Sequence, residues 1–290
     1  MSGGGGLESA VREAPLLHGV RVVSVAYNLP GPAAAARLGQ LGAHVTKVEP
    51  PSGDPAEELA PAWYRSLTAG QEVVRLDLKE PEGRRALEEH LARADLFITS
   101  NRPSSLARLG LDPESVGRRH PRLCRVAIVG YPPPDEERAG HDLSYQGSVG
   151  LLDPPSPPRT LLADLAGAER TVSQSLALLL ARERTGEANF SRVSLAEAVR
   201  PFADPLHHGL TAPGGPLGGG FAGYDLYPAG EGWVAVAALE PRFRERLREE
   251  LGVEALEREA LERAFQERTA EEWERWARER DLPVTRVRAP

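Results

Sequence analysis

The sequence predicts an α/β fold in which a mostly parallel sheet with flanking helices is followed by a smaller α+β domain. As far as about residue 200, short runs of β-branched residues alternate with segments of helical length. Strands that alternate with helices are typical of βαβ units, which build parallel sheets. Beyond the glycine-rich stretch 214–220, two short strand patterns precede charged amphipathic helices, which indicates a second and smaller domain.

The first half of the α/β part divides into regular elements. The β-branched run Val20–Ala26 predicts the first strand, and the turn Asn28–Pro32 separates it from a helix over Ala33–Leu41. Two short helices are expected between residues 99 and 123. The remaining strands are predicted at residues 44–48, 72–78, 95–99 and 123–129, and a further helix at 81–93.

The second half is less regular. Residues 131–160 are rich in proline and predict loops. Residues 165–184 have the composition of a long helix, with Leu176, Leu179 and Leu180 expected on its buried side, and residues 191–195 predict one more strand that leads into a helix. In the small domain, we expect strands at 225–227 and 233–237 and helices between 242 and 280.

The expected domains are a flexible lead-in over residues 1–18, a large α/β domain over 19–200, a glycine-rich connector over 201–220 and a small domain over 221–290. The small domain has few large apolar residues, so alone it would bury little core, and we expect docking on a partner to support it.

Composition excludes several classes of function. The net charge of −7 disfavours a nucleic-acid partner. The single cysteine, Cys124, permits neither an intramolecular disulfide nor a cysteine metal cluster, and no other metal-ligand set stands out. No run approaches the roughly 18 apolar residues of a membrane span, and the start of the chain lacks the pattern of a signal peptide. We therefore expect a cytoplasmic protein with no membrane partner.

A series of short motifs is more informative than any one of them. No Gly-x-Gly-x-x-Gly follows the first strand, which argues against a dinucleotide cofactor. The motifs stand in the order Gly31-Pro32, Leu41-Gly42-Ala43-His44-Val45-Thr46-Lys47-Val48-Glu49-Pro50, Leu76-Asp77-Leu78-Lys79, Asn101-Arg102-Pro103, Leu109-Gly110-Leu111, Gly140-His141-Asp142-Leu143-Ser144-Tyr145, Ala163-Asp164-Leu165-Ala166-Gly167, Arg184-Thr185-Gly186 and Val236-Ala237-Ala238-Leu239-Glu240-Pro241.

This succession resembles the family III CoA-transferases, the CaiB/BaiF superfamily, from about residue 17 to the end. The resemblance implies a Rossmann-like large domain that binds CoA, a smaller domain, and two chains interlocked as a homodimer. It implies an acyl-CoA thioester as substrate and no metal or nicotinamide cofactor. The Gly-His-Asp-x-x-Tyr and Leu-Glu-Pro motifs are most similar to those of the α-methylacyl-CoA racemases, whereas many transferases carry Tyr-Asp at the position of His141.

The resemblance also implies roles for individual residues. His141 and Asp164 are expected to exchange the α-proton on opposite faces of the thioester, and Glu240 to orient the imidazole. We expect CoA to contact Arg102 through its phosphates, with Lys47 as a weaker candidate, Leu76 against the adenine and Tyr145 in the acyl pocket.

From the pattern alone, the same residues have structural interpretations. Asp164 precedes a predicted helix, which favours an N-cap, and the two roles are compatible since helix N-termini favour negative charge and can stabilise an oxyanion. His141 and Arg102 would be solvated loop residues, and Glu240 would begin a helix. Lys47 would pair with neighbouring glutamates, Leu76 would be sheet core, and Tyr145 would simply pack.

Four features depart from the family pattern. Thr68-Ala69-Gly70-Gln71 stands where the family usually has Asn-Arg-Gly-Lys, and Gly130-Tyr131-Pro132-Pro133-Pro134 replaces a glycine-rich loop. Thr160 stands where racemases often have Asn, and family members usually continue for tens of residues beyond the position of Pro290.

The sequence thus leaves three functions open. The first is a racemase that epimerises a 2-methylacyl-CoA thioester by 1,1-proton transfer through an enolate. The second is a CoA-transferase in which Asp164 forms an acyl anhydride and then an aspartyl-CoA thioester. The third is a diverged member that binds CoA without catalysis.

Overall fold

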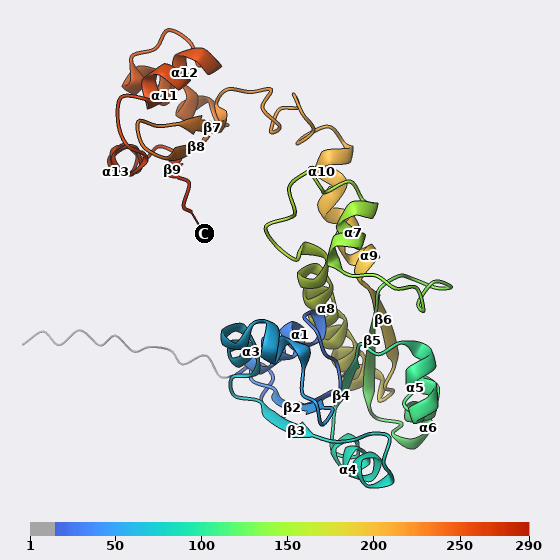
Figure 1. Cartoon of the computed structure of the whole chain (residues 1–290). Helices are drawn as coiled ribbons and strands as arrows, with labels where there is room; N and C mark the ends of the chain where they lie inside the picture. Colours follow the sequence, from blue (N-terminus) through green and yellow to red (C-terminus); the bar gives the residue numbers. More distant parts are fainter. Residues whose placement is uncertain (1–14, 290) are drawn as a thin grey trace, which may run out of the picture. The chain divides into compact units, whose positions relative to one another are not determined.

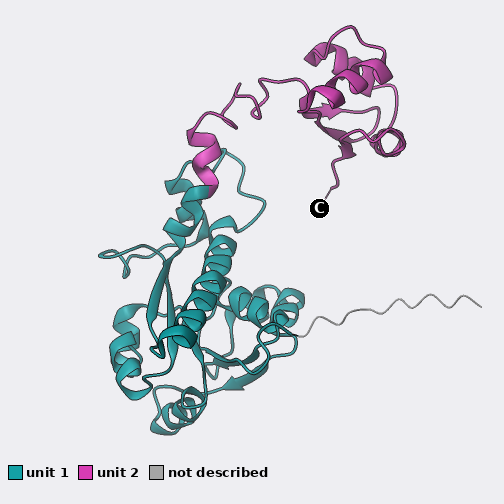
Figure 2. Ribbon diagram, turned by 180° about the vertical axis from the view of Figure 1, so that it is seen from behind, with its two compact units in different colours: residues 1–201 teal, residues 202–290 magenta. Residues whose placement is uncertain are grey.

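A computed structural model describes residues 15–289. The expected lead-in therefore lies mostly outside the described residues. The chain forms two compact units, of which the first ends at Pro201 and the second begins at Phe202 (Figures 1 and 2). Each unit is described by itself.

The first unit contains a six-stranded parallel sheet with the strand order β3-β2-β1-β4-β5-β6. The predicted α/β fold class is confirmed. The elements are β1 (Arg21–Ser24), α1 (Pro30–Gln40), β2 (His44–Glu49), α2 (Pro55–Leu59), α3 (Pro61–Thr68), β3 (Glu72–Arg75), α4 (Pro81–Leu91), β4 (Leu96–Thr99), α5 (Pro103–Leu109), α6 (Pro113–Arg119), β5 (Cys124–Val129), α7 (Asp142–Ser148), α8 (Leu162–Thr185), β6 (Phe190–Ser194) and α9 (Leu195–Val199).

Local sequence explains where many of these helices begin and end. Proline occupies the first turn of α1, α4, α5 and α6, where its missing N–H costs nothing and its fixed φ suits a helix. Gly110 and Gly186 end α5 and α8 in the left-handed conformation, with φ of 67° and 78°.

Packing places helices on both faces of the sheet. The residues Val22, Val23 and Ser24 of β1 are all buried, although neighbours in a strand point to opposite faces. Helices α4, α5 and α6 share one hydrophobic core with Val23, Val25 and Phe97. Helices α1 and α8 pack on each other, and α8 also contacts β5.

The structure corrects two expectations for this unit. Leu176 and Leu180 of α8 are 37% and 52% exposed, and only Leu179 of the predicted trio is buried. Small residues such as Gly167 and Thr171 form the buried side of α8 instead, which allows close helix packing. The proline-rich region also contains the short helix α7. Its Gly and Ser residues have low helix propensity, so the sequence predicted a loop there.

The second unit contains α10 (Asp204–His207), β7 (Tyr224–Pro228), β8 (Trp233–Ala237), α11 (Pro241–Leu251), α12 (Arg258–Phe265), α13 (Ala270–Glu279) and β9 (Val284–Arg286). The antiparallel sheet has the order β7-β8-β9, so a third strand joins the predicted pair. Its core gathers Tyr227, Phe265, Trp273 and Trp276, and the Trp273 indole donates a 2.8 Å hydrogen bond to the carbonyl of Phe265.

None of the helices in residues 15–289 combines the length and hydropathy that crossing a bilayer requires.

Candidate functional site

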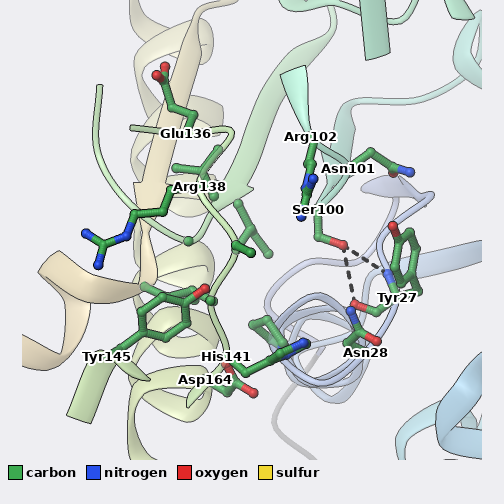
Figure 3. A pocket seen from close by; sticks show the side chains of 17 residues that line it. Tyr27, Asn28, Ser100, Asn101, Arg102, Glu136, Arg138, His141, Tyr145 and Asp164 are labelled. Carbon is green, nitrogen blue, oxygen red and sulfur yellow. Dashed lines mark hydrogen bonds between the residues drawn. The ribbon is translucent and has the colours of Figure 1, made fainter. Parts of the chain in front are cut away.

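A cavity of about 240 Å³ lies at the carboxyl ends of β1, β4, β5 and β6 (Figure 3). In the strand order of this sheet, β1 and β4 are the neighbours at which the direction of chain progression reverses. Crevices at such a switch point are the usual ligand sites of open α/β sheets. His141, Tyr145, Asp164 and Arg102 all line this cavity.

A second cavity of about 610 Å³ lies along the carboxyl ends of β1, β2 and β3. Leu76 lines it together with three cationic side chains, Lys79, Arg84 and Arg108. Arg84 donates to the carbonyls of Leu78 and Lys79, so its guanidinium is partly engaged. The two cavities share Tyr27 and Asn101 in their linings, which makes them neighbours along one edge of the sheet.

Asp164 lies in the first turn of α8, two residues after the helix begins. It is not the N-cap, so that interpretation of the sequence is wrong. Within residues 15–289, its carboxylate accepts no hydrogen bond and is free to face the cavity. Burial, with the nearby negative charge of Asp142 as a second cause, raises the pKa of Asp164 to about 7.

His141 is the N-cap residue of α7, with extended backbone at φ −137° and ψ 173°. Its backbone carbonyl accepts the N–H groups of Ser144 and Tyr145, which is how the helix starts. Its imidazole has no hydrogen-bond partner among the described residues. Figure 3 shows His141 and Asp164 among the side chains that line the cavity, with Tyr145 on one side and Tyr27 and Asn28 on the other.

Tyr145 is buried, and its ring meets Tyr131 edge to face at 5.2 Å between centroids. Burial is the main cause that raises the pKa of the Tyr145 phenol to about 12. Gly130 and Gly140 leave room for this ring, since a Cβ built at Gly130 would lie 2.4 Å from the Tyr145 hydroxyl and one at Gly140 would lie 2.8 Å from its Cε1. Tyr145 thus forms a rigid, neutral wall of the cavity.

Arg102 precedes α5, where its exposed side chain reaches the first cavity. No ion pair holds its guanidinium within the described part of the chain. The adjoining proline-rich loop is anchored next to it, because the carboxylate of Glu137 accepts the N–H and hydroxyl of Ser104 at 2.7 and 3.0 Å. The cation is therefore available to an anionic ligand.

Lys47 lies elsewhere. Its side chain is 1% exposed, and its ammonium group donates to Glu49 and to Asp54, the latter at 2.7 Å. It lines neither cavity. The predicted pairing with neighbouring carboxylates is what the structure contains, and the predicted contact with CoA stays a prediction.

Glu240 belongs to the second unit, where it is the N-cap residue of α11. This agrees with the structural interpretation that it begins a helix. Its predicted action on the imidazole concerns a different unit from the cavity and stays a prediction.

Several cavity residues were not singled out from the sequence. Tyr27, Asn28 and Arg138 line the first cavity, and Lys79 and Arg108 line the second. Lys79 and Tyr27 follow predicted strands, and the carboxyl edge of a parallel sheet is the signal that would have found them. Asn28, at the start of the predicted turn, carries a positive φ of 67°, a conformation that asparagine adopts more readily than most residues. Residues 15–289 hold no cluster of carboxylate, imidazole or thiol groups arranged for a metal ion.

The sequence and the fold of this chain are similar to those of known proteins. The model of "CoA-transferase family III" matches residues 17–290. The chain is 30% identical over 262 residues to the α-methylacyl-CoA racemase of Mus musculus, covering 83% of this chain and 66% of the racemase. It is 28% identical to the succinate–glutarate CoA-transferase of Agrobacterium fabrum, covering 83% of this chain and 68% of that protein. The chain thus spans about two thirds of the length of these relatives.

Two solved structures have a fold similar to that of this chain. The crystal structure of a hypothetical protein from Mycobacterium tuberculosis superposes with a TM-score of 0.81 at 26% identity, covering 96% of this chain and 86% of that one. A structure of a CaiB/BaiF family protein from Brucella suis has a TM-score of 0.79 at 24% identity, which supports the fold.

Proposed function

The chain belongs to CoA-transferase family III, and from that premise we propose that it epimerises a 2-methylacyl-CoA thioester by 1,1-proton transfer. The observation that carries the proposal is that the side chains of His141 and Asp164 line one cavity. Neither side chain makes a hydrogen bond or ion pair within the described residues. Inversion of the carbon next to a thioester carbonyl requires one base to remove a proton and one acid to return a proton to the other face. An imidazole and a carboxyl group supply these two functions.

The electrostatics of Asp164 support this role. An ordinary aspartate is too weak a base to share a proton with imidazole, whose unperturbed pKa is about 6.5. The pKa of Asp164 is raised to about 7, mainly by burial. A carboxyl group with a pKa near neutrality can act as base when ionised and as acid when protonated, which reaction in both directions requires.

The neighbouring cavity supports CoA as the carrier of the acyl group. CoA is long and carries phosphates at one end and the thioester at the other. We propose that the adenosine part lies in the larger cavity against Leu76, near Lys79 and Arg108, while the thioester lies in the smaller one. Arg102 is placed to bind a phosphate oxygen with its guanidinium fork.

Two parts of the proposal rest on the family motifs. Glu240 is proposed to orient and charge-balance the imidazole of His141. The assembly is proposed to be an interlocked homodimer of a cytoplasmic enzyme. Sedimentation at micromolar concentration tests the assembly, and a monomer of 31.3 kDa would contradict it.

The reaction is tested by incubating each epimer of a branched acyl-CoA with the protein in deuterated water. We expect deuterium at the α-carbon together with inversion. His141→Ala and Asp164→Asn should both abolish inversion, while each retains exchange only for the epimer whose α-proton faces the remaining base. Absence of exchange with every branched thioester would refute the racemase.

A CoA-transferase is the second candidate, and the unpaired Asp164 carboxylate favours it. A carboxylate with no hydrogen bonds in a cavity can attack a donor thioester, forming a mixed anhydride and releasing the CoA thiolate. The thiolate then attacks the aspartyl carbonyl of the anhydride, which forms the aspartyl-CoA thioester and releases the donor acid as its carboxylate. Hydroxylamine distinguishes the candidates, since only the transferase gives a donor-dependent hydroxamate on Asp164. A member without catalysis would fail both tests, and millimolar or absent binding of acetyl-CoA by calorimetry would support that third possibility.

A further inference from the structure

Asp142 directly follows His141 in the chain, and its buried carboxylate accepts hydrogen bonds from the backbone at Asp164 and from its neighbours. It is 3% exposed, and its Oδ1 accepts the backbone N–H groups of Ala163 at 2.8 Å and of Asp164 at 3.1 Å. Its Oδ2 accepts Nε2 of Gln146 at 2.5 Å, and the same Nε2 also donates to the carbonyl of Thr160 at 3.1 Å. The two bonds to Oδ1 therefore tie α7 to the first turn of α8, while the bond from Gln146 lies within α7.

These bonds replace a local helix cap. The N-cap position of α8 is Leu161, whose side chain has no oxygen to offer the first N–H groups of the helix. Asp142 supplies that oxygen from 22 positions earlier in the sequence. The backbone N–H groups of Ala163 and Asp164 are thereby occupied, so these two cannot serve as oxyanion donors.

The same residue lies next to His141 in the chain and is the first residue of α7. A single carboxylate thus fixes the backbone that carries the imidazole and the backbone that carries the Asp164 side chain. A displacement of about 1 Å at such a pair reduces the rate of proton transfer strongly.

Building on the proposed function, we propose that Asp142 is its positioning residue: its carboxylate holds the first turns of α7 and α8 together, so that His141 and Asp164 stay in one cavity. Its negative charge has a second effect. It is the Coulombic cause, after burial, of the raised pKa of Asp164. Asp142 therefore helps to fix the position of the Asp164 carboxyl group and adds to the effect of burial on its proton affinity.

Other charged or titratable groups also face this cavity. They are His141 and Tyr145 at α7, Glu136 and Arg138 in the preceding loop, Arg102 after β4 and Tyr27 after β1. Glu136 lies 3.6 Å from Arg192, which compensates its charge. The test must therefore remove one charge at a time and observe Asp164 directly.

The experiment compares Asp142→Asn, Asp142→Ala and the control Asp112→Asn. Asp112 caps α6 through the N–H of Ser115 at 2.9 Å and lines neither cavity, so it matches Asp142 as a cap alone. Asp142→Asn keeps an oxygen for the two N–H groups and removes the charge. The titration midpoint of the Asp164 carboxyl group is read by carbon-13 NMR, and α-proton exchange is measured from pH 5 to 9.

In Asp142→Asn, we expect the Asp164 midpoint to fall by about one pH unit or more, and the acid limb of the exchange profile to move by the same amount. In Asp142→Ala, amide hydrogen exchange should rise in the first turn of α8, and kcat should fall about 100-fold with little change in KM. Asp112→Asn should leave both the midpoint and the profile unchanged.

An unchanged Asp164 midpoint in Asp142→Asn, or an unchanged exchange profile, would overturn the inference. An equal shift in Asp112→Asn would do the same. The NMR midpoint is read without substrate. A protein that lacks α-proton exchange but shows the shifted midpoint would refute the racemase and leave the electrostatic effect of Asp142 established.

Discussion

The ammonium group of Lys47 donates a 2.7 Å hydrogen bond to Asp54, and these side chains are 1% and 0% exposed. Glu49, which is 2% exposed, accepts from Lys47 as well and also from the hydroxyl of Tyr64 at 2.7 Å. A cation buried with two carboxylates is costly to remove, because the partners keep their buried charges. The cluster links β2 to the segment that follows it, and Lys47 and Glu49 of β2 belong to one sequence motif.

Replacement of Lys47 by methionine is therefore expected to reduce the free energy of unfolding by about 3 kcal/mol or more. Chemical denaturation measures this loss. Lys79→Met is the matched control, since Lys79 is exposed at the larger cavity, and it should weaken CoA binding while stability stays unchanged. If Lys47→Met weakened CoA binding in calorimetry without loss of stability, the ligand-binding prediction for Lys47 would replace the structural one.

Gly130→Ala is expected to displace Tyr145, since the new Cβ would lie 2.4 Å from its hydroxyl but 3.2 Å from the ring carbon Cζ. The clash thus concerns the hydroxyl most of all. We expect a loss of roughly 1–3 kcal/mol of stability, as is typical of overpacking. In the double variant with Tyr145→Phe, thermal unfolding should recover most of that loss, and a recovery no larger than additivity would count against this geometry.

Asp164→Asn is expected to stabilise the protein above pH 7. Because the folded pKa of Asp164 is about 7 and its unfolded pKa about 3.9, the folded state binds more protons between these values. Wild-type stability should therefore fall as pH rises from about 4 to 7, and the neutral amide avoids this loss.

The gain at pH 8 should be on the order of 2 kcal/mol, since each unit of pKa difference is worth about 1.4 kcal/mol and the side chain is partly exposed. Melting temperatures of both proteins from pH 5 to 8.5 give the comparison. Parallel curves for the two proteins would show that Asp164 has an ordinary pKa.

Arg102→Met is expected to weaken CoA binding about 10-fold or more at low salt, because a guanidinium in contact with phosphate contributes a charge-assisted hydrogen bond. The loss should shrink as salt rises, since screening already weakens the wild-type contact. Calorimetry at two salt concentrations measures both effects. Arg118→Met is the control, because Arg118 pairs with Glu114 on α6 and lines neither cavity. Equal Kd values for Arg102→Met and Arg118→Met would remove Arg102 from the binding site.

The sequence by itself determined the α/β class, because β-branched runs and proline-started helices are local signals. It also placed His141 and Asp164 as candidates, through the order of its motifs. Their meeting in one cavity, at the carboxyl edge of the sheet, agrees with that order.

Only the tertiary structure decided the partners of these groups. The cap of α8 comes from Asp142, a residue 22 positions away, and no local pattern predicts a hydrogen bond between segments brought together by packing. For Lys47 the sequence predicted carboxylate partners, but its burial depends on Asp54 and Tyr64 folding over β2. Burial and charge pairing depend on what the rest of the chain places alongside a residue, and the pKa of Asp164 follows from both.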